Sequence, residues 1–482
     1  MGNIELARRL IDAVRRAGAG EFCVCAGSRN SPLLAVLGAS DARLFSFVDE
    51  RSAAFFALGR MKLHGDPVAV VTTSGTAVAE LLPAAIEAFY SGLPLILVTA
   101  DRPARFRGTG APQSIEQVGL FGAYAETSLE TWSRARPLHL NIEFDEPLLD
   151  APHPALRTTL SPQAGRGAMN ALLPTAWGEG ARRADEGRRP LVILGGLAPR
   201  HHSRVRELVH APVYAEPLSG LREDGTLPLI FAIPRGEFDS VIRIGNVPTL
   251  RFWRDLETMD LPVVHYSDLP FAGLTRGEVH PIESLPRIEG PFDFDRDREM
   301  RARFEALLDD EPQSELAMFR TLSREIPEGA RVYLGNSLPI REWDLAATRE
   351  PRGFTIEANR GANGIDGQLS TFFGQCDPAR ENVCVVGDLT AIYDLNAPWI
   401  VPQLDRGVRF RIVIVNNGGG RIFSRVPSLR ALDEPLRERI IENVHDVRFG
   451  HWAAMWNIAV TELRPDAAAS KRVWQRYDEL WG

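Results

Sequence analysis

NVCVVGDLTAIYDLNAPWIVPQLDRGVRFRIVIVNNGGG, residues 382–420, contains the pattern that decides the fold. An apolar run ends in Gly-Asp, a helical segment (LTAIYDLNAPWIVPQL) follows, and a second apolar run ends in Asn-Asn-Gly. Strand, helix and strand in this order predict two adjacent parallel strands, with Asp388 and Asn417 at their carboxyl ends. Open α/β sheets bind their ligands at that edge.

Asp388 and Asn417 suit a magnesium ion that is shared with a diphosphate. Asp388 offers a carboxylate oxygen and Asn417 an amide oxygen, and both are hard ligands of the kind that Mg²⁺ prefers. The glycines that follow Asn417 allow a phosphate to approach the backbone closely. Either half alone is more often only turn chemistry. The two halves in one strand-helix-strand unit favour a metal and diphosphate site.

The same alternation continues on the N-terminal side of this segment. In the last third of the chain, ARVYLGNS and GFTIEAN are further predicted strands. In the first 140 residues, EFCVCAG, RLFSFVDE, PVAVVTTSG and LPLILVTADRP alternate with helical segments. The first helix is predicted over residues 4–17, with Asn3 as its N-cap. We therefore predict an α/β protein with a doubly wound parallel sheet at each end of the chain.

The middle of the chain is predicted to be a smaller α/β domain. Its strand candidates are PLVILGG, SVIRIGN and PVVHYS, and it has more Pro and Gly than the flanking regions. Residues 285–315 are polar and charged, the composition of a linker that leads into a helix. The predicted domains are residues 1–155, 156–295 and 296–482.

Composition argues against several classes of function. The formal net charge is -8 over 482 residues, and no basic stripe is present, so we expect no nucleic-acid partner. No apolar run approaches the roughly 18 residues that a membrane span needs, and we expect no membrane span. The cysteines have neither disulfide nor metal spacing and are predicted to be buried thiols of a cytoplasmic protein; they are Cys23, Cys25, Cys376 and Cys384.

The pairing of GD with NN about thirty residues later resembles the cofactor motif of thiamine-diphosphate enzymes, with Leu389 in place of the usual third glycine. Further strings are similar to the menaquinone-pathway synthases that make 2-succinyl-5-enolpyruvyl-6-hydroxy-3-cyclohexene-1-carboxylate. They occur in both outer domains and in the family's order: CAGSRNSPL, DERSAAFFALG, TTSGTAVAELLPAAIEA, LVTADRP, GAPQSIEQVGLF, GNSLPIR, NRGANGIDGQLST, GDLTAIYDLNA and NNGGGRIFS. The resemblance implies a three-domain thiamine-diphosphate-binding fold.

The resemblance implies thiamine diphosphate and Mg²⁺, or Mn²⁺, as cofactors. Glu50 matches the glutamate that, in the family, hydrogen-bonds the aminopyrimidine ring so that the ring can remove the thiazolium proton. The implied metal ligands are Asp388, Asn417 and Gly419. Ile365 corresponds to an apolar residue under the bent cofactor, and an aromatic residue lies beside the reacting carbon. The full set of implied cofactor-binding residues is Glu50, Gly387, Asp388, Leu389, Thr390, Ile365 and Phe423.

The resemblance also implies residues that act on two carboxylated substrates, 2-oxoglutarate and isochorismate. The catalytic positions carried over are Glu50, Ser28, Arg29 and Gln113. The substrate-binding positions carried over are Arg102, Ser337, Arg341, Arg360 and Arg251. Guanidinium groups bind carboxylates bidentately and keep their charge at any working pH, which suits dicarboxylate substrates.

The implied reaction is decarboxylation of 2-oxoglutarate and addition of the resulting succinyl-semialdehyde carbanion to isochorismate, a transferase step of menaquinone biosynthesis. In the family, the glutamate of one subunit reaches a cofactor that is held by another subunit. The resemblance therefore implies a homodimer or a homotetramer.

Three features depart from the family pattern. Pro112 stands where the family commonly has Asn, and Leu250 stands where it has Lys beside Arg251. The chain ends at DELWG, where the family usually continues with another strand and helix, so we expect part of the last sheet's edge to be absent.

Three alternative functions are kept open. The chain could be another thiamine-diphosphate 2-oxo acid decarboxylase or carboligase, or a catalytically silent paralogue. A dinucleotide oxidoreductase would need GxGxxG after the first strand, where this chain has AGSRNS. The ten histidines form no metal-binding pair, and we assign them no function.

Overall fold

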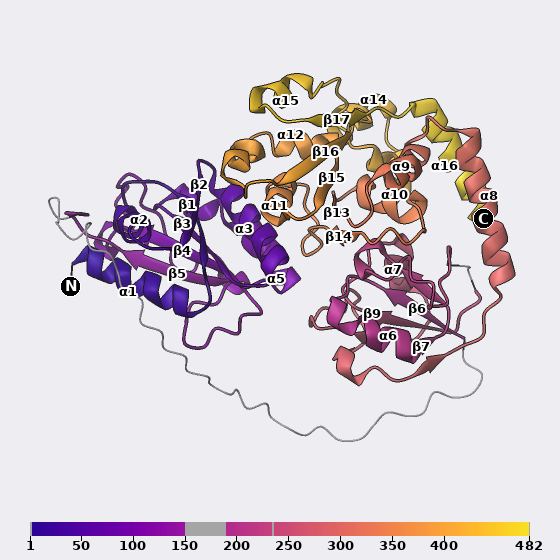
Figure 1. Ribbon diagram of the computed structural model, residues 1–482, viewed down its shortest axis with the longest axis horizontal. Helices are drawn as coiled ribbons and strands as arrows, with labels where there is room; N and C mark the ends of the chain where they lie inside the picture. Colours follow the sequence, from indigo (N-terminus) through magenta and orange to yellow (C-terminus); the bar gives the residue numbers. More distant parts are fainter. Residues whose placement is uncertain (1, 150–188, 234–235, 482) are drawn as a thin grey trace.

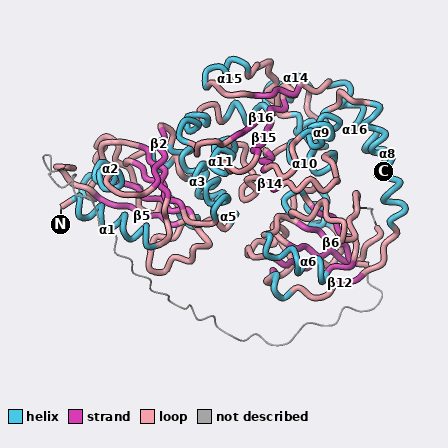
Figure 2. The backbone as a smooth tube through the Cα atoms, viewed as in Figure 1, coloured by secondary structure: helices cyan, strands magenta, loops and turns pink. Residues whose placement is uncertain are grey.

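The computed structural model describes residues 2–149, 189–233 and 236–481, and its strands form three five-stranded parallel sheets and one small two-stranded sheet (Figure 1). One five-stranded sheet belongs to the N-terminal part of the chain, one to the middle and one to the C-terminal part. Figure 2 shows helices around each group of strands, as the α/β prediction requires. The predicted boundary at residues 155 and 156 lies outside the described residues, and the domain limits stay predictions.

The N-terminal sheet has the strand order β2-β1-β3-β4-β5. The central strands β3 and β4 are buried along their whole length, which is typical of parallel strands covered on both faces. The four strands predicted in this region are confirmed, and β5 was not predicted. The strands are β1 (Glu21–Cys25), β2 (Arg43–Phe47), β3 (Val68–Thr72), β4 (Leu95–Asp101) and β5 (Leu138–Glu143). The helices are α1 (Asn3–Arg16), α2 (Ser31–Gly38), α3 (Glu50–His64), α4 (Thr76–Ala79) and α5 (Leu82–Ser91).

The first helix is confirmed, but Asn3 is not its N-cap. Gly2 occupies the N-cap position, and Asn3 is the first helical residue. The side-chain nitrogen of Asn3 instead donates to the carbonyl oxygens of Asp145, at 2.7 Å, and Pro147, at 2.9 Å. The N-cap prediction was wrong because this side chain binds the segment after β5 rather than its own helix.

The central sheet has the order β11-β10-β9-β6-β8. The strands predicted from PLVILGG, SVIRIGN and PVVHYS are confirmed, whereas β8 and β11 are too short to leave a pattern. The strands are β6 (Pro190–Leu194), β8 (Val213–Ala215), β9 (Ser240–Ile244), β10 (Val263–Tyr266) and β11 (Val279–His280), with a separate pair of β7 (Val209–His210) and β12 (Ile288–Glu289). The α-helices are α6 (His202–Leu208) and α7 (Arg251–Asp255).

The C-terminal sheet has the order β14-β13-β15-β16-β17. Its strands are β13 (Arg331–Leu334), β14 (Thr355–Glu357), β15 (Glu381–Gly387), β16 (Arg409–Val415) and β17 (Val460–Leu463). Its helices are α8 (Phe294–Asp310), α9 (Glu315–Glu325), α10 (Leu338–Ala346), α11 (Gln368–Gln375), α12 (Asp388–Tyr393), α13 (Pro427–Arg430), α14 (Glu434–Leu436), α15 (Gly450–Trp456) and α16 (Ala467–Trp481). The four predicted strands are confirmed, and β17 forms an edge. The predicted loss of a further edge strand stays a prediction.

The pairing that decides the fold is present as expected. β15 and β16 are parallel neighbours, and Gly387 lies opposite Val415. Asp388 and Asn417 therefore follow adjacent strands at the same edge.

The helix predicted between β15 and β16 is shorter than expected. It ends at Tyr393, and the 3₁₀ segment η8 (Ala397–Gln403) follows. Asp394, after the last helical turn, accepts hydrogen bonds from the backbone N–H groups of Gly367, at 2.8 Å, and Leu369, at 2.9 Å. Pro398 then opens η8, since proline fits a first helical turn but not a helix interior.

All three large sheets share one strand order. In each sheet the first strand lies between the second and the third, so the chain reverses its direction of growth between the first and third strands. In the C-terminal sheet the loops at this switch point are GNSLPIR and GDLT, and in the N-terminal sheet they are AGSRN and TSGTA. These segments carry eight of the seventeen predicted site residues: Ser28, Arg29, Ser337, Arg341, Gly387, Asp388, Leu389 and Thr390.

Helices α3 and α11 join the N-terminal and C-terminal sheets (Figure 1). A Cβ atom on Gly59 would lie 2.1 Å from the carbonyl oxygen of Thr371, and one on Gly374 would lie 2.1 Å from that of Phe56. The two backbones are therefore in direct contact. One apolar core continues from one sheet to the other through this crossing.

A buried arginine joins the central sheet to the C-terminal sheet. Arg222 is fully buried, and its guanidinium donates to carbonyl oxygens at the end of α10. Nearby, the hydroxyl of Tyr214 donates to Asp344 at 2.7 Å. The central sheet thus fixes the C-terminal end of the helix whose first turns carry Ser337 and Arg341. The carbonyl acceptors of Arg222 belong to Trp343, Asp344, Ala347 and Thr348.

The four cysteines are free thiols and are buried, as predicted. Burial raises the pKa of each thiol. Across the parts of the chain that the structure describes, no helix has the length and apolar character to cross a membrane.

Candidate active site

A cavity of about 100 Å³ opens at the carboxyl edge of the C-terminal sheet. Its lining comes from the start of α9 and from the loops that follow β13, β14, β15 and β16. The structure brings nearly all of the predicted cofactor and metal residues to this one place. Those that line the cavity are Ile365, Gly387, Asp388, Leu389, Thr390, Asn417, Gly419 and Phe423, together with Ser337, which was predicted to bind substrate.

The carboxylate of Asp388 is held by backbone N–H groups. One oxygen accepts from Gly418 at 2.8 Å and from Gly419 at 3.0 Å, and the other accepts from Leu389 at 2.7 Å. Burial raises the pKa of Asp388, and these hydrogen bonds oppose the rise. A carboxylate has about four acceptor positions, so capacity for a cation remains.

The turn after Asn417 requires glycine. Gly419 has φ +134, a backbone conformation that side chains disfavour. A Cβ atom on it would lie 2.6 Å from the carbonyl oxygen of Glu442. The backbone N–H groups can therefore point at Asp388 only because this residue has no side chain.

A hydrogen bond to a carboxyl group fixes the orientation of the side-chain amide of Asn417. Its nitrogen donates to Glu315 at 2.9 Å. The oxygen of the same amide is then the atom that remains for the cavity. Two hard oxygens from Asp388 and Asn417, with glycine backbone around them, fit Mg²⁺ and a diphosphate.

Sequence reasoning missed the carboxyl groups behind this cavity. Burial raises the pKa of Glu315 and of Glu342, and the positive charge of Arg425 opposes the rise for both. Arg425 donates to Glu342 at 2.9 Å. The sequence gives no distinct signal for Glu315, because Ser-Glu before an apolar run is the ordinary start of a helix.

His445 is a second residue that sequence reasoning did not select. Its Nε2 lies 3.4 Å from Asp388, and its Nδ1 accepts the backbone N–H of Val447 at 3.2 Å. The ring hydrogen must therefore be on the nitrogen that faces Asp388. No motif surrounds His445 in the sequence, so composition alone could not have found it.

Ser337 is strained where the loop after β13 enters α10. It has φ +72 and ψ -124, a conformation that is rare outside glycine. Strain of this kind persists where the surrounding structure fixes the residue, and it concentrates at functional sites. The carbonyl oxygen of Ser337 accepts from Arg341 at 2.6 Å.

Two predicted substrate arginines share one electrostatic environment. The pKa of Arg341 is lowered to about 10, first by burial and then by the positive charges of Arg360 and Arg254. Arg360 also donates to Asn336 at 2.9 Å. Glu216, from the central sheet, is a buried carboxyl beside the two arginines, and in its ionised form it raises the pKa of both. This cluster could bind a carboxylate.

The structure does not bring Arg251 into that cluster. Its side chain is 65% exposed, and its Nε lies 3.6 Å from Asp255. Arg254, three residues later on α7, is the charge from this helix that acts on Arg341. Buried Glu216 accepts the backbone N–H groups of Thr249, at 2.5 Å, and Leu250, at 2.9 Å.

The N-terminal edge carries Glu50 as the first residue of α3. Burial raises the pKa of Glu50, and the nearby carboxylates of Asp49 and Glu80 raise it further. Asp49 is the N-cap of the helix and accepts the N–H of Ser52 at 3.0 Å. Glu50 is therefore a half-buried carboxyl that holds its proton more tightly than usual, which suits proton transfer.

Gln113 lies against the loop after β3. It has φ +54 and is exposed, and its Cα lies 3.0 Å from where a Cβ of Gly75 would be. The buried Gln117, which sequence reasoning missed, supports this loop. Its side chain accepts the N–H of Gly75 at 2.8 Å and donates to the carbonyl of Ala100 at 3.1 Å.

The remaining predicted residues of this edge differ in exposure. Ser28 is exposed. Arg29 is buried, donates to the carbonyl of Phe144 at 3.0 Å and pairs with Glu146 at 3.1 Å. Arg102 donates to the carbonyl of Pro112 at 3.0 Å. Within one chain, both arginines are thus engaged with the protein itself.

Glu50 does not line the cavity at the edge of the C-terminal sheet. The residues that line it all fall between 315 and 423. The residues on either side of Glu50 instead bind the segment that follows α12. Arg51 donates to Asp394 at 2.9 Å, and Asn396 donates to Asp49.

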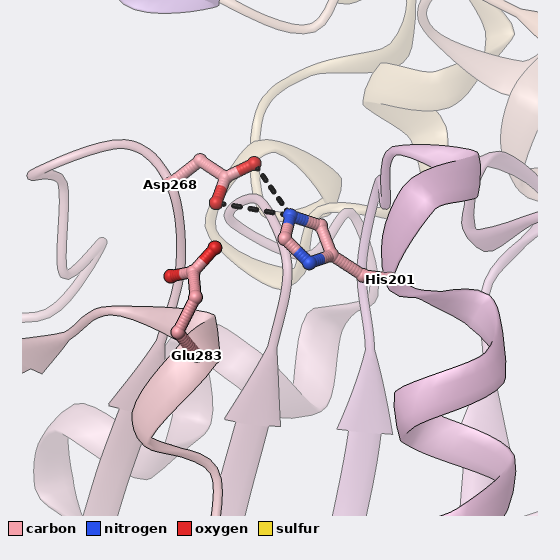
Figure 3. Close-up of side chains that lie close together, drawn as sticks. All are labelled: His201, Asp268 and Glu283. Carbon is pink, nitrogen blue, oxygen red and sulfur yellow. Dashed lines mark hydrogen bonds and ion pairs between the residues drawn. The ribbon is translucent and has the colours of Figure 1, made fainter.

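A separate cluster of potential metal ligands lies at the carboxyl edge of the central sheet (Figure 3). His201 Nε2 is 3.1 and 3.0 Å from the two oxygens of Asp268, with Glu283 beside them. Arg200 also donates to Asp268. Because Asp268 already accepts from Arg200 and lies beside His201, we assign the histidine of this cluster no function.

Comparison with known proteins connects these features. Residues 4–120 match the family described as thiamine pyrophosphate enzyme, N-terminal TPP binding domain. The 2-succinyl-5-enolpyruvyl-6-hydroxy-3-cyclohexene-1-carboxylate synthase of Bdellovibrio bacteriovorus is 39% identical over all of both chains. That of Akkermansia muciniphila is 40% identical over 93% of this chain and 89% of the relative. That of Halobacterium salinarum is 33% identical over 89% of this chain and 86% of the relative.

Proposed function

The chain belongs to the 2-succinyl-5-enolpyruvyl-6-hydroxy-3-cyclohexene-1-carboxylate synthase family, and on that premise we propose that it catalyses this synthase reaction of menaquinone biosynthesis. It removes CO₂ from 2-oxoglutarate and joins the remaining four-carbon fragment to isochorismate. Thiamine diphosphate, when bound, supplies the electron sink that stabilises the carbon from which CO₂ leaves.

The observation that carries the proposal is the set of polar groups that Asp388 and Asn417 present to the cavity at the edge of the C-terminal sheet. Asp388, fixed by three backbone N–H groups, and Asn417, turned by Glu315, would hold Mg²⁺ or Mn²⁺. Gly387 and Gly419 leave room for the diphosphate, while Leu389 and Thr390 line the same cavity. Ile365 and Phe423 would support and face the rings of the cofactor.

Glu50 would hold the proton that starts the chemistry. Its raised pKa, caused first by burial, keeps it in a range where it can give and take a proton with the aminopyrimidine ring. Ser28 and Gln113 lie at the same exposed edge and would orient the substrate next to it.

The carboxylates of the substrates would bind the cluster of Arg341 and Arg360, with Ser337 beside them. These guanidinium groups are partly desolvated, and in such surroundings they bind carboxylates more strongly than they would in water. Arg102 and Arg29 would contribute from the N-terminal edge, and Arg251 would contribute only if α7 turned.

We propose that the functional form is a homodimer or a larger assembly of dimers. The cavity is lined without Glu50, so a second copy would have to supply that carboxyl. Large apolar side chains are exposed beside both groups of predicted site residues: Val48 next to Glu50, Val118 beyond Gln113, and Phe423 in the cavity. A second copy would cover these side chains. The buried free thiols support a cytoplasmic location.

The test is CO₂ release from 2-oxoglutarate by the purified chain with thiamine diphosphate and Mg²⁺, with and without isochorismate. Turnover that needs both substrates supports the proposal. CO₂ release at the same rate with and without isochorismate would favour a decarboxylase with another acceptor. Cofactor binding without turnover would favour a silent paralogue.

A further inference from the structure

We propose that Glu315 is a positioning residue that turns the side chain of Asn417 so that the amide oxygen, and not the nitrogen, faces the cavity. This inference rests on the proposed function, because the oxygen matters there as a ligand of the metal ion. Glu315 would not touch the metal, the cofactor or a substrate in this role.

The two ends of an asparagine amide have nearly the same shape, so packing alone does not select one of them. A hydrogen-bond partner does select one. The nitrogen of Asn417 lies 2.9 Å from Oε1 of Glu315, and a carboxyl oxygen that accepts a hydrogen bond requires the N–H end. The oxygen end is left toward Asp388 and the cavity that both residues line.

Glu315 is itself held in place. It is 3% exposed and is the first residue of α9, where Ser314 caps the helix by accepting the N–H of Ala317 at 3.3 Å. The backbone N–H of Glu315 donates to the hydroxyl of Ser470 at 3.0 Å. A carboxyl fixed at both its backbone and its side chain can serve as a reference point for a neighbouring loop.

The buried carboxyl pair is balanced by an arginine from the same loop as Asn417. Arg425 donates to Glu342 at 2.9 Å, and its guanidinium lies 3.6 Å from the ring centre of Trp474. Buried charges are tolerated when they are paired and hydrogen-bonded in this way. The loop from Asn417 to Arg425 is thus attached at both ends to Glu315 and Glu342, and it carries Gly419 and Phe423 between them.

The first experiment measures the affinity for Mn²⁺ in the presence of thiamine diphosphate, by titration with electron paramagnetic resonance detection. Glu315→Ala is expected to weaken Mn²⁺ binding by about 10- to 100-fold, the effect usual for groups that orient metal ligands. Glu325→Ala, an exposed residue of the same helix, is the matched control and should bind as the wild type does. Circular dichroism and the unfolding temperature report whether each variant folds.

The second experiment exchanges the amide and the carboxyl group between positions 417 and 315. Asn417→Asp alone places two carboxyl groups against each other and should bind Mn²⁺ poorly. Adding Glu315→Gln gives the new carboxylate an N–H partner while a carboxylate oxygen still faces the cavity, so the double variant should bind at least about tenfold more tightly than Asn417→Asp. A merely structural role for Glu315 gives no such rescue.

The outcomes separate the two proposals. Wild-type protein that binds no Mn²⁺ with thiamine diphosphate would overturn the proposed function, and this inference with it. Wild-type binding that is unchanged in Glu315→Ala would overturn this inference alone, as would a double variant that binds no better than Asn417→Asp. If Glu315→Ala does not fold, the comparison of the double variant with Asn417→Asp still tests whether Glu315 orients Asn417.

Discussion

The N-terminal and C-terminal sheets have the same strand order, but the polar residues at their carboxyl edges differ in burial. The C-terminal edge is hollow, with Asp388 buried under glycine N–H groups and Asn417 turned by a buried carboxyl. The N-terminal edge presents Glu50 half-buried and Ser28 and Gln113 exposed. One topology therefore supports two kinds of site. The C-terminal edge suits the binding of a charged group, and the N-terminal edge suits proton transfer to something bound elsewhere.

The largest expected effect comes from removing the proton-transfer group of the N-terminal edge. Glu50→Gln should lower kcat by about 10²- to 10⁴-fold, the usual contribution of general acid–base catalysis, while thiamine diphosphate still binds. CO₂ release measures the first quantity and a cofactor titration the second. Glu130→Gln, at an exposed carboxyl of the same part of the chain that does not act on Glu50, is the control. Unchanged turnover in Glu50→Gln would contradict the division between the two edges.

The complementary change removes the carboxylate of the C-terminal edge. Asp388→Ala should weaken Mn²⁺ binding by at least about 100-fold, because loss of a ligand exceeds the effect of losing a group that only orients one. Turnover at saturating 2-oxoglutarate should recover in part at high Mn²⁺, which would not happen with Glu50→Gln. Equal loss of metal binding in both variants would show that the edges are not specialised.

The arginine cluster offers a smaller effect. Arg341→Ala should raise the KM for 2-oxoglutarate by about 10- to 150-fold, which corresponds to one hydrogen bond to a charged group. Arg251→Ala, in which an exposed ion pair is lost, should change KM by less than about fivefold. Steady-state kinetics of the two variants compare them directly. A larger effect at Arg251 would mean that α7 turns toward the cavity when substrate binds.

The last expected effect is on stability and not on activity, and it concerns Glu216, which belongs to neither outer sheet. Burial raises its pKa from 4.5 to about 8, so the folded protein keeps a proton that the unfolded chain releases. Stability from this group is complete below about pH 4.5 and is lost as the pH rises to 8, at about 1.4 kcal/mol per pH unit. Glu216→Gln should remove this slope.

Urea unfolding of wild type and Glu216→Gln at pH 5.5 and pH 7.5 checks the expectation. The glutamine keeps an oxygen that can accept the N–H groups of Thr249 and Leu250, so the variant should fold. Parallel pH dependence in the two proteins would mean that Glu216 is already ionised in the folded state.

Much of the fold could be predicted from sequence because buried parallel strands are nearly continuous apolar runs. β3, β4, β15 and β16 each have such a run. β8 and β11 could not be found, since strands of three and two residues have no period. The helix after β15 was predicted too long, because only tertiary contacts of Asp394 decide where it ends.

Some residues of the candidate site could also be predicted from the sequence, and others could not. Asp388 and Asn417 follow apolar runs with glycines behind them, so their sequence context marks them. Glu315 and His445 reach the same place from distant segments, and their own neighbours in sequence give no sign of it. The reach of Arg254 toward Arg341 depends on how α7 is docked on the central sheet, which a sequence pattern does not contain.

The contact between Gly59 and Gly374 limits how the chain can be recombined. Because the backbones of α3 and α11 touch there, a hybrid protein must inherit both glycines from compatible parents, even though they are 315 positions apart in the sequence. A hybrid that brings any side chain to either position would force the helices apart and shift Glu50 at the start of α3. The two outer domains therefore form one unit of exchange, and we expect crossover points that preserve function to fall outside both helices.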